Sequence, residues 1–379
     1  MPYLDHAATA PVRPDVLRAM WPHLAGGPAN PSSRHEPGRT AAAALAWARE
    51  QIAASLGARA SDVILTAGGT EADNLAVKGI ALAAPRGRRI VTSPTEHPAV
   101  LESCRALARL GGFAVELLPV DGAGRVHPDD VAAAVDADTT LVTIAVASSE
   151  LGTVQPIAQI AAIARAGGVP MHTDAVQAAG ALPLSMAELG VDAMSVAGHK
   201  VGAPTGAGAL LARRSLPLEP LLHGGGQQDG RRSGTEDVAA AVGLAVALRL
   251  ATDGLEDRAA ALARRRGRVA AAVAERLPST ILVGDPVDRL PGHLSWLIPG
   301  VTSEAVLLRL DERGVQVSSG TACAAGEDEP AEALLACGIE PDLARTQVRA
   351  SFGAETTDDD LDAFVDELAA ALESLMPTV

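Results

Sequence analysis

A lysine and an aspartate each come at the end of a short apolar run in this chain. Lys200 follows Gly198-His199 and the apolar run Met194–Ala197. Asp174 comes shortly after the apolar run Val169–Met171. A lysine amine can form a Schiff base with an aldehyde, and a carboxylate can keep a pyridine nitrogen protonated. Together the two residues predict a binding site for pyridoxal 5′-phosphate (PLP), a cofactor of amino-acid chemistry.

Each of these residues also has an ordinary structural interpretation. Lys200 alone is equally consistent with a surface lysine after a loop, and Asp174 alone is more typical of a helix N-cap. Gln177 follows Asp174 by three positions, so it could lie on the same side of a helical turn and reach the ring hydroxyl.

The segment Thr66-Ala67-Gly68-Gly69-Thr70-Glu71 lies between an expected strand and an expected helix. Its two glycines allow a ligand to approach the backbone. Thr70 adds a hydroxyl at a helix start, where free N–H groups and the helix dipole favour phosphate. The alternative interpretation is a well-capped helix start without a ligand.

Two further residues could contact the cofactor or its substrate. His97 follows a predicted strand and could stack on the ring and exchange protons near neutral pH, although a loop histidine is more often only solvated. Arg349 interrupts a strand-like run and could bind a carboxylate through two parallel hydrogen bonds. A structural ion pair is the alternative for Arg349.

One of the three cysteines has an unusual setting. Cys323 follows Ser318-Ser319-Gly320-Thr321-Ala322 and precedes an acidic stretch, a composition that predicts a flexible, exposed loop. A loop cysteine suits a nucleophile that visits a site and then leaves with cargo. Cys104 and Cys337 lie in alanine-rich helical contexts, and we expect them to be buried packing residues.

Composition limits the class of protein. The chain has 379 residues, 48% of them hydrophobic, and a formal net charge of −15. This charge argues against direct nucleic-acid binding, and three widely spaced cysteines indicate neither a disulfide framework nor a zinc site. The apolar stretch Val238–Leu248 is too short to span a bilayer, and no signal peptide is seen at the N-terminus. We therefore expect a cytoplasmic protein with no metal site and no membrane contact.

Short apolar runs alternate with helical patterns between residues 60 and 212. The alternation predicts an α/β fold in which helices cover a mostly parallel sheet. Ligands of such sheets bind at the carboxyl ends of the strands, where Lys200 and Asp174 stand. The expected strands are Val63–Thr66, Ile90–Thr92, Val115–Pro119, Leu141–Val146, Val169–His172, Ala193–Val196 and Ala209–Leu211, and the expected helices are Glu71–Leu82, Ala99–Leu110, Pro128–Val135 and Pro156–Ala166.

The C-terminal part has a different pattern. A helical region from about Glu236 to Arg276 is expected to connect two domains, and an α+β pattern follows it. We predict a large domain over 15–255 and a small domain formed by 1–14 and 256–379. The expected elements of the C-terminal part are Leu294–Ile298, Glu304–Arg313, Val315–Val317, Ala331–Ala336, Gln347–Ser351 and Asp358–Leu375.

The ordered motifs resemble those of the cysteine desulfurases, class-V aminotransferases of PLP fold type I. The resemblance covers nearly the whole chain and implies a large domain with a seven-stranded sheet. Its Ser-Ser-Gly-x-Ala-Cys form is similar to the long-loop class, which feeds iron–sulfur assembly. The matching motifs are Tyr3–Thr9, Asn30–Ser33, Gly69–Gly79, Thr95–His97, Asp174–Gln177, Gly198–Lys200, His223–Gln227, Arg232–Thr235, Ser318–Cys323 and Val348–Arg349.

The resemblance implies a role for each cofactor residue. Lys200 would hold PLP and act as the base on Cα, Asp174 would pair with the ring nitrogen, and Gln177 would contact the ring oxygen. His97 would stack on the ring. The implied phosphate-binding residues are Gly69, Thr70, His199 and, from the other subunit of a homodimer, Thr235.

The resemblance also implies the substrate chemistry. Arg349 would bind the carboxylate of L-cysteine, with Asn30 as a second substrate-binding residue. Cys323 would attack the substrate sulfur, so that alanine leaves and a persulfide remains. An acceptor such as an iron–sulfur scaffold protein or a tRNA-thiolation enzyme would then take the sulfur, and use in a sulfur-containing metabolite is equally open.

Two positions depart from the family pattern. The chain has Ser148-Ser149-Glu150-Leu151-Gly152 where the family usually has Asn-Asn-Glu-Ile-Gly, and Ala197 where many members have serine. Ser149 takes the place of an asparagine that touches the ring oxygen and the substrate, and its side chain is shorter. The alternatives are therefore a selenocysteine lyase, a lyase that releases sulfide directly, or a degenerate scaffold that only binds a sulfur-relay partner.

Overall fold

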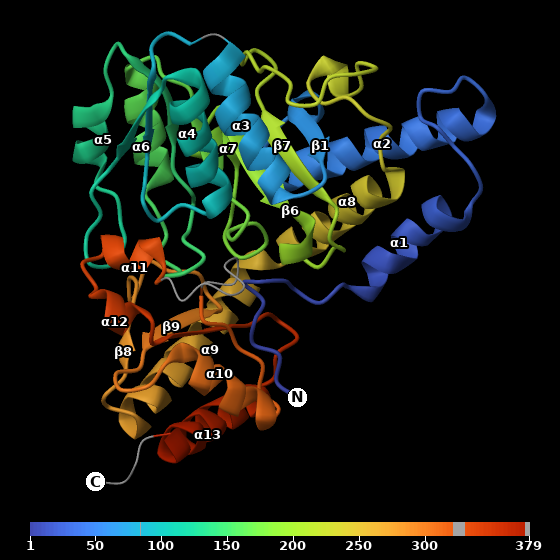
Figure 1. Cartoon of the computed structure of the whole chain (residues 1–379). Coiled ribbons are helices and arrows are strands. Elements are labelled where there is room, and N and C mark those ends of the chain that lie inside the picture. The colour runs from blue at the N-terminus through green and yellow to red at the C-terminus, as the bar shows by residue number, and fades with distance from the viewer. Residues whose placement is uncertain (84, 321–329, 376–379) are drawn as a thin grey trace.

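A seven-stranded sheet forms the centre of the molecule (Figure 1), whose computed structural model describes residues 1–83, 85–320 and 330–375. Its strands are β1 (Val63–Thr66), β2 (Arg89–Thr92), β3 (Ala114–Leu117), β4 (Thr139–Thr143), β5 (Met171–Asp174), β6 (Ala193–Ala197) and β7 (Gly208–Ala212). Their order is β1-β7-β6-β5-β4-β2-β3. All pairs from β6 to β3 are parallel, whereas β7 is antiparallel to β1 and β6. The predicted mostly parallel seven-stranded sheet is therefore confirmed.

Helices lie on both faces of this sheet. They are α1 (Pro14–Ala25), α2 (Glu36–Ser55), α3 (Gly69–Ala83), α4 (Pro98–Gly111), α5 (Pro128–Ala134), α6 (Ile157–Ala166), α7 (Met186–Leu189) and α8 (Val238–Thr252), with short 3₁₀ turns at Ala60–Asp62, Gly198–Lys200 and Gln228–Gly230. Helices α3 and α4 form one hydrophobic core with the sheet, and α2, α6 and α8 contribute to another. Every residue of β4 to β7 is buried, as expected for strands covered on both sides.

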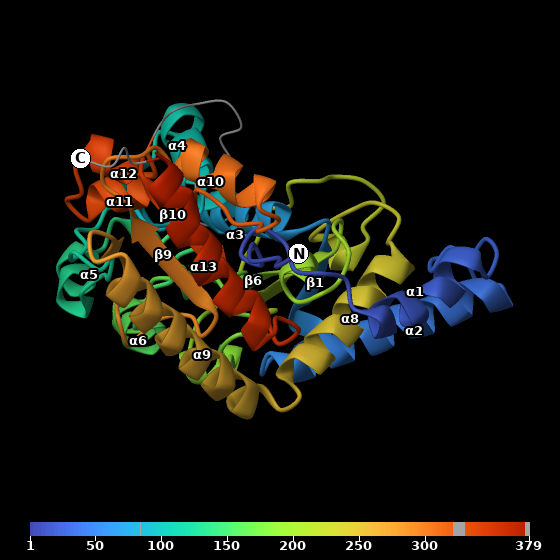
Figure 2. The same ribbon diagram turned by 90° about the horizontal axis from the view of Figure 1, so that it is seen from below.

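A smaller α+β unit follows the sheet. It contains the antiparallel strands β8 (Ile281–Leu282), β9 (His293–Leu297) and β10 (Gln347–Ser351), together with α9 (Leu255–Arg276), α10 (Ser303–Glu312), α11 (Glu332–Ala336), α12 (Pro341–Ala344) and α13 (Asp358–Leu375). Figure 2 shows α9 and α13 beside β9 and β10. Their core includes Trp296 and Phe364, whose ring centroids lie 5.9 Å apart, and also Leu4 from the N-terminal segment. The domain division at 15–255 stays a prediction, and the separate cores are compatible with it.

Two expectations about secondary structure need correction. The expected strand Val315–Val317 is not a strand: Gln316 forms only an isolated bridge with Tyr3. The region from Glu236 to Arg276 is helical but divided into α8 and α9, which meet at an angle of 70°. Gly254 lies between them with a φ of +60°, a left-handed conformation that interrupts a helix and that glycine adopts readily.

The bend also bears on membrane spanning. Among the described helices, none is individually long and apolar enough to cross a bilayer. Helices α8 and α9 taken together have the length and apolar composition of a membrane span, but they are bent relative to each other.

Candidate active site

Lys200 lies just beyond the carboxyl end of β6, in the 3₁₀ turn Gly198–Lys200. Its half-buried side chain points toward the N-terminal segment, where Nζ donates hydrogen bonds to the carbonyl oxygens of Ala7 and Ala8, the latter at 2.8 Å. The interpretation of Lys200 as a solvated surface lysine is therefore wrong.

Asp174 ends β5, the strand next to β6, and only 7% of its surface is exposed. Its Oδ1 accepts a hydrogen bond of 2.8 Å from the N–H of Val176, a local turn like the one expected of a capping residue. Burial raises the pKa of Asp174, and the nearby His97 and Lys200 oppose that rise. The parallel strands thus bring Asp174 and Lys200 to the same edge of the sheet, as predicted.

His97 stands directly before α4. Its Nδ1 accepts a hydrogen bond of 3.1 Å from the N–H of Ala99, so the proton of the neutral ring is on Nε2. Burial lowers the pKa of His97 and Lys200 lowers it further, whereas Asp174 raises it. His97 is therefore a neutral ring close to the Asp174 carboxyl group, rather than only a solvated loop histidine.

The N-terminal segment also binds Gln177. The Nε2 of Gln177 donates a 3.0 Å hydrogen bond to the carbonyl oxygen of Ala7, which also accepts from Lys200. Gln177 therefore lies beside Lys200, and its contact with a ring oxygen stays a prediction.

Two of the predicted phosphate-binding residues, Gly69 and Thr70, lie at the start of α3. Gly69 opens this helix, and a Cβ there would come within 2.8 Å of the Val176 side chain, so only glycine fits without a shift. Thr70 is exposed at the first turn. His199 has its pKa lowered to about 4 by burial and by Lys200 and His97, which makes it a neutral hydrogen-bonding group. The free N–H groups of the helix start suit an anion here.

Two predicted residues do not join this site within one chain. Thr235 lines a pocket with Thr66, Ala67 and Gly208 whose lining includes neither Lys200 nor Asp174. Asn30 is exposed in the loop between α1 and α2, and its Oδ1 accepts a hydrogen bond from the N–H of Ser32 at 2.9 Å. Figures 1 and 2 both show α1 and α2 projecting to one side. A role for either residue at the cofactor site stays a prediction.

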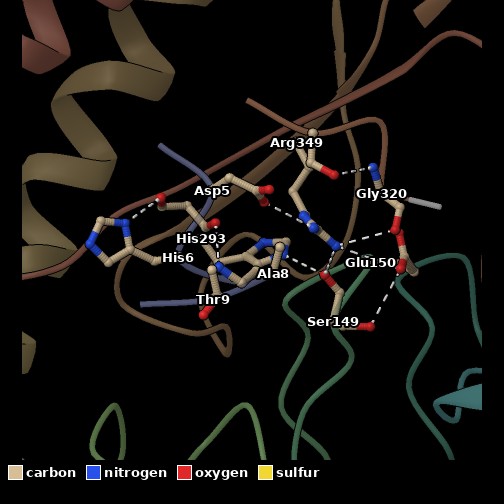
Figure 3. Close-up of polar contacts among 12 residues, drawn as sticks. Asp5, His6, Ala8, Thr9, Ser149, Glu150, His293, Gly320 and Arg349 are labelled. Carbon is tan, nitrogen blue, oxygen red and sulfur yellow. Dashed lines mark hydrogen bonds and ion pairs between the residues drawn. The ribbon is translucent and has the colours of Figure 1, made fainter. Parts of the chain in front are cut away.

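Arg349 is the centre of a second polar group, the arginine cluster, which we define as Asp5, Ser149, Glu150, Gly320 and Arg349 (Figure 3). Arg349 lies on β10 and is 2% exposed. Its Nη1 donates to the carbonyl oxygens of Ser149 and Gly320 at 3.1 and 3.3 Å, and its Nη2 donates to Asp5 Oδ1 at 3.2 Å. Glu150 Oε1 lies 3.6 Å from Nη1. The ion pair considered for Arg349 is thus present.

Ser149 and Glu150 lie together beside Arg349. The Ser149 hydroxyl donates to Glu150 Oε1 at 3.4 Å, and the Ser149 carbonyl also accepts a hydrogen bond of 2.9 Å involving His293 Nε2. Burial raises the pKa of Glu150, and the Arg349 charge opposes the rise. A contact of Ser149 with the cofactor ring stays a prediction.

Cys323 itself lies outside the described residues. The described chain reaches Gly320, where a Cβ would come within 2.3 Å of Glu150 Oε2 and 2.4 Å of Gln347 Oε1. Cys104 is buried as expected, whereas Cys337 is only partly buried.

A set of buried polar residues beneath Asp174 was not predicted from the sequence. Thr143 on β4, His172 on β5, Ser195 on β6 and Asp73 on α3 form what we define as the buried polar network. Two features of the sequence could have revealed this network: Asp73 is a polar residue on an apolar helix face, and His172 is a histidine inside a strand. In the sequence, Asp73 stood out only as part of a longer motif.

The residues present fit PLP. They include a lysine and a buried carboxyl group at neighbouring strand ends, a neutral histidine close to that carboxyl group, and a glycine-bearing helix start. A Schiff base, a ring-nitrogen partner, a stacking ring and a phosphate site are what this cofactor requires of a protein.

Comparisons with known proteins identify the family of this chain. The Aminotransferase class-V family model matches residues 2–364. The chain is 45% identical over 380 residues to an IscS-like cysteine desulfurase of Mycobacterium tuberculosis, covering 98% of this chain and 96% of that protein. It is 41% identical over 374 residues to the cysteine desulfurase IscS of Dictyoglomus turgidum, covering 98% and 95%.

Solved structures show the same similarity. A NifS-like protein superposes with a TM-score of 0.92 at 32% identity, over 98% of this chain and 99% of that one. A structure described as SspA in complex with cysteine superposes with a TM-score of 0.81 at 33% identity, over 94% and 100% of the two chains.

Proposed function

This chain belongs to the class-V aminotransferase family and is a PLP-dependent cysteine desulfurase, and from this premise we propose that Cys323 takes the sulfur of L-cysteine as a persulfide and passes it to an acceptor. The observation that carries the proposal is the hydrogen bond from Arg349 to the carbonyl oxygen of Gly320. It places a buried cation, suited to the substrate carboxylate, next to the segment that leads to Cys323.

The overall reaction balances without an oxidant or reductant. L-Cysteine and the Cys323 thiol give L-alanine and the Cys323 persulfide. The S–S bond forms as the Cβ–S bond of the substrate breaks, and the substrate carbon takes up a proton in place of sulfur. PLP, when bound, supplies an electron sink that stabilises negative charge on the substrate.

The residues of the sheet edge prepare this chemistry. Lys200 would anchor the cofactor and then move a proton at the substrate Cα, and Asp174 would hold the proton on the ring nitrogen. His97 keeps its Nδ1 occupied by the N–H of Ala99, which fixes the plane of the ring that would stack on the cofactor. Gly69, Thr70 and His199 would bind the phosphate.

The arginine cluster would select the substrate. A guanidinium binds a carboxylate through two parallel hydrogen bonds, and Arg349 is already oriented by Ser149, Gly320 and Asp5. The substrate would then lie with its carboxylate at Arg349 and its sulfur accessible to Cys323.

The test compares the wild type with Lys200→Ala and Cys323→Ala in the full chain supplied with L-cysteine. We expect alanine and protein persulfide from the wild type and neither from Lys200→Ala. Cys323→Ala should retain bound PLP and form no persulfide, and Cys337→Ala is the matched control that should behave as wild type. Persulfide transfer by Cys323→Ala would refute the assigned nucleophile. Release by this variant of sulfide from L-cysteine, or of selenide from L-selenocysteine supplied instead, would favour the lyase alternatives.

We also propose a homodimer in which Thr235 and the α1–α2 loop complete the partner's site. Helix α1 exposes Leu17, Trp21 and Leu24 by 51%, 67% and 64%, an apolar face suited to a partner. Light scattering should give twice the chain mass for the wild type and a shift toward the monomer for Trp21→Glu. A monomeric wild type would oppose this proposal.

We propose as acceptor a thiol of a cluster-scaffold or tRNA-thiolation protein, in a reducing compartment such as the cytoplasm. Support comes from the resemblance of the Cys323 motif to the long-loop class. Transfer of labelled sulfur from the Cys323 persulfide to candidate proteins would test it, and equal transfer to unrelated thiol proteins would oppose it.

A further inference from the structure

Four buried polar side chains extend beneath Asp174, on the face of the sheet that α3 covers. His172 and Asp174 are two residues apart on β5, so their side chains share one face. Ser195 is the cross-strand partner of Asp174, and Thr143 is the partner of His172. Asp73 reaches the same place from α3 and is 1% exposed.

Hydrogen bonds join three of these side chains, and Asp73 lies next to them. His172 Nδ1 lies 2.9 Å from Thr143 Oγ1, and His172 Nε2 lies 2.9 Å from Ser195 Oγ. Asp73 adjoins Ser195, and a hydrogen bond donated by Ser195 would favour the charged form of Asp73 and lower its pKa. The Oδ1 of Asp73 lies 3.8 Å from His172 Nε2 and has no hydrogen-bond partner.

Two directions of hydrogen bonding are geometrically possible among these side chains. In one, Asp73 is a carboxylate that accepts from Ser195. In the other, Asp73 carries a proton, donates to Ser195, and Ser195 donates to His172 Nε2, which leaves the His172 proton on Nδ1 toward Thr143.

The surroundings favour the second direction. Two acidic groups face Asp73, namely Asp174 and Glu96, and both disfavour a further negative charge there. The third titratable neighbour is His172, which is neutral because burial lowers its pKa to about 3. Burial is the largest cause of the raised pKa of Asp73. A carboxylate with one oxygen lacking any partner is costly in a dry interior, whereas a protonated acid is much less so.

We propose that Asp73 is a neutral carboxylic acid that donates a hydrogen bond into the buried polar network, and that Asp174 is thereby left as the carboxyl group that becomes negative beside the cofactor ring. Asp73 is a positioning residue: it acts through Ser195 and His172 and touches neither substrate nor cofactor. The inference rests on the proposed role of Asp174 and does not depend on Cys323.

The test measures protonation directly, on the purified full-length protein with and without PLP. The infrared difference between wild type and Asp73→Asn at neutral pH should show loss of a carboxylic-acid C=O band, and imidazole nitrogen NMR should find the His172 proton on Nδ1. Loss of a carboxylate band instead, or a proton on Nε2, would overturn the proposal. Both signals are independent of sulfur transfer, so they separate failure of this proposal from failure of the proposed function.

Cofactor binding supplies a second measurement. Asparagine keeps the shape and the hydrogen-bond donor of a neutral acid. Asp73→Asn should therefore retain the absorption spectrum of bound PLP and a PLP affinity within about threefold of the wild type. Asp73→Leu should bind PLP more than about tenfold more weakly. Glu96→Gln is the matched control, because Glu96 is buried nearby but accepts from the N–H of Ala145 instead of joining the network. It should leave the His172 proton on Nδ1. Equal loss of affinity in the Asn and Leu variants would oppose the proposal.

Discussion

The sheet edge around Asp174 and the arginine cluster both bury carboxyl groups, but only the cluster contains a guanidinium. Asp73 and Glu96 lie beneath Asp174, and burial raises the pKa of both, with no arginine or lysine among the causes that oppose the rise. Burial also raises the pKa of Glu150, yet there Arg349 opposes it. Burial therefore disfavours the charged form of the carboxyl groups in both regions, and only in the arginine cluster does a guanidinium favour that form.

The largest expected effect comes from removing the charge at the sheet edge. Asp174→Ala removes the group that would hold the ring-nitrogen proton, so we expect kcat to fall by about 10³-fold with a shifted absorption of bound PLP. Steady-state alanine formation and the absorption spectrum measure the two effects. An unchanged spectrum would mean that Asp174 does not face the ring.

A change in the arginine cluster should act on substrate binding. Arg349→Lys keeps the charge but loses the paired donors, so we expect KM for L-cysteine to rise by about 100-fold while the PLP spectrum stays that of the wild type. Steady-state kinetics separate the two parameters. A fall in kcat at unchanged KM would place Arg349 outside the substrate carboxylate site.

The charge state of Asp73 predicts a dependence of stability on pH. The pKa of Asp73 in the folded protein is raised above its value in the unfolded chain. Its contribution to the free energy of unfolding is therefore fully present below about pH 4 and is lost as the pH rises through the folded pKa. The free energy of unfolding of Asp73→Asn relative to wild type should therefore increase by about 1.4 kcal/mol per pH unit in that window. Urea unfolding at several pH values measures it.

His172 provides the internal control for that experiment. The pKa of His172 in the folded protein is about 3, below its value in the unfolded chain. Its contribution to the free energy of unfolding is therefore fully present above about pH 6.5 and is lost as the pH falls. Both proteins contain His172, and the effect therefore cancels in the difference. A difference that does not change with pH would show that Asp73 is charged in the folded protein.

The smallest expected effect concerns the family departure at Ser149. Ser149→Asn lengthens the side chain by an amide that could reach the ring oxygen, so we expect kcat/KM to improve by about two- to tenfold. The same kinetic assay measures it, with Ser148→Asn as the control expected to show less than a twofold change. A loss of activity would mean that the Ser149 hydroxyl matters through its bond to Glu150.

The sequence predicted the strand ends and the residues that follow them. Apolar runs identify β5 and β6, and the parallel arrangement then brings Asp174 and Lys200 to one edge. The strand expected at Val315–Val317 failed because pairing there is limited to Gln316 with Tyr3, a contact with the distant N-terminal segment that local pattern does not encode.

The polar contacts between distant segments could not be predicted. His172 and Asp73 read as a strand residue and a helix residue, and only packing of α3 on the sheet shows that they share one network. Lys200 and Gln177 both donate hydrogen bonds to the carbonyl oxygen of Ala7. These bonds likewise depend on how the N-terminal segment crosses the site.

That crossing has a consequence for biosynthesis. Asp5 and Arg349 are 344 residues apart in sequence, and Ala7 N–H donates to Ser351 Oγ over the same separation. The segment with Asp5 and Ala7 must therefore wait for the segment with Arg349 and Ser351 before these contacts can form. The large sheet can fold while the chain is still being synthesised, but we expect competence to bind substrate only after synthesis has passed Ser351.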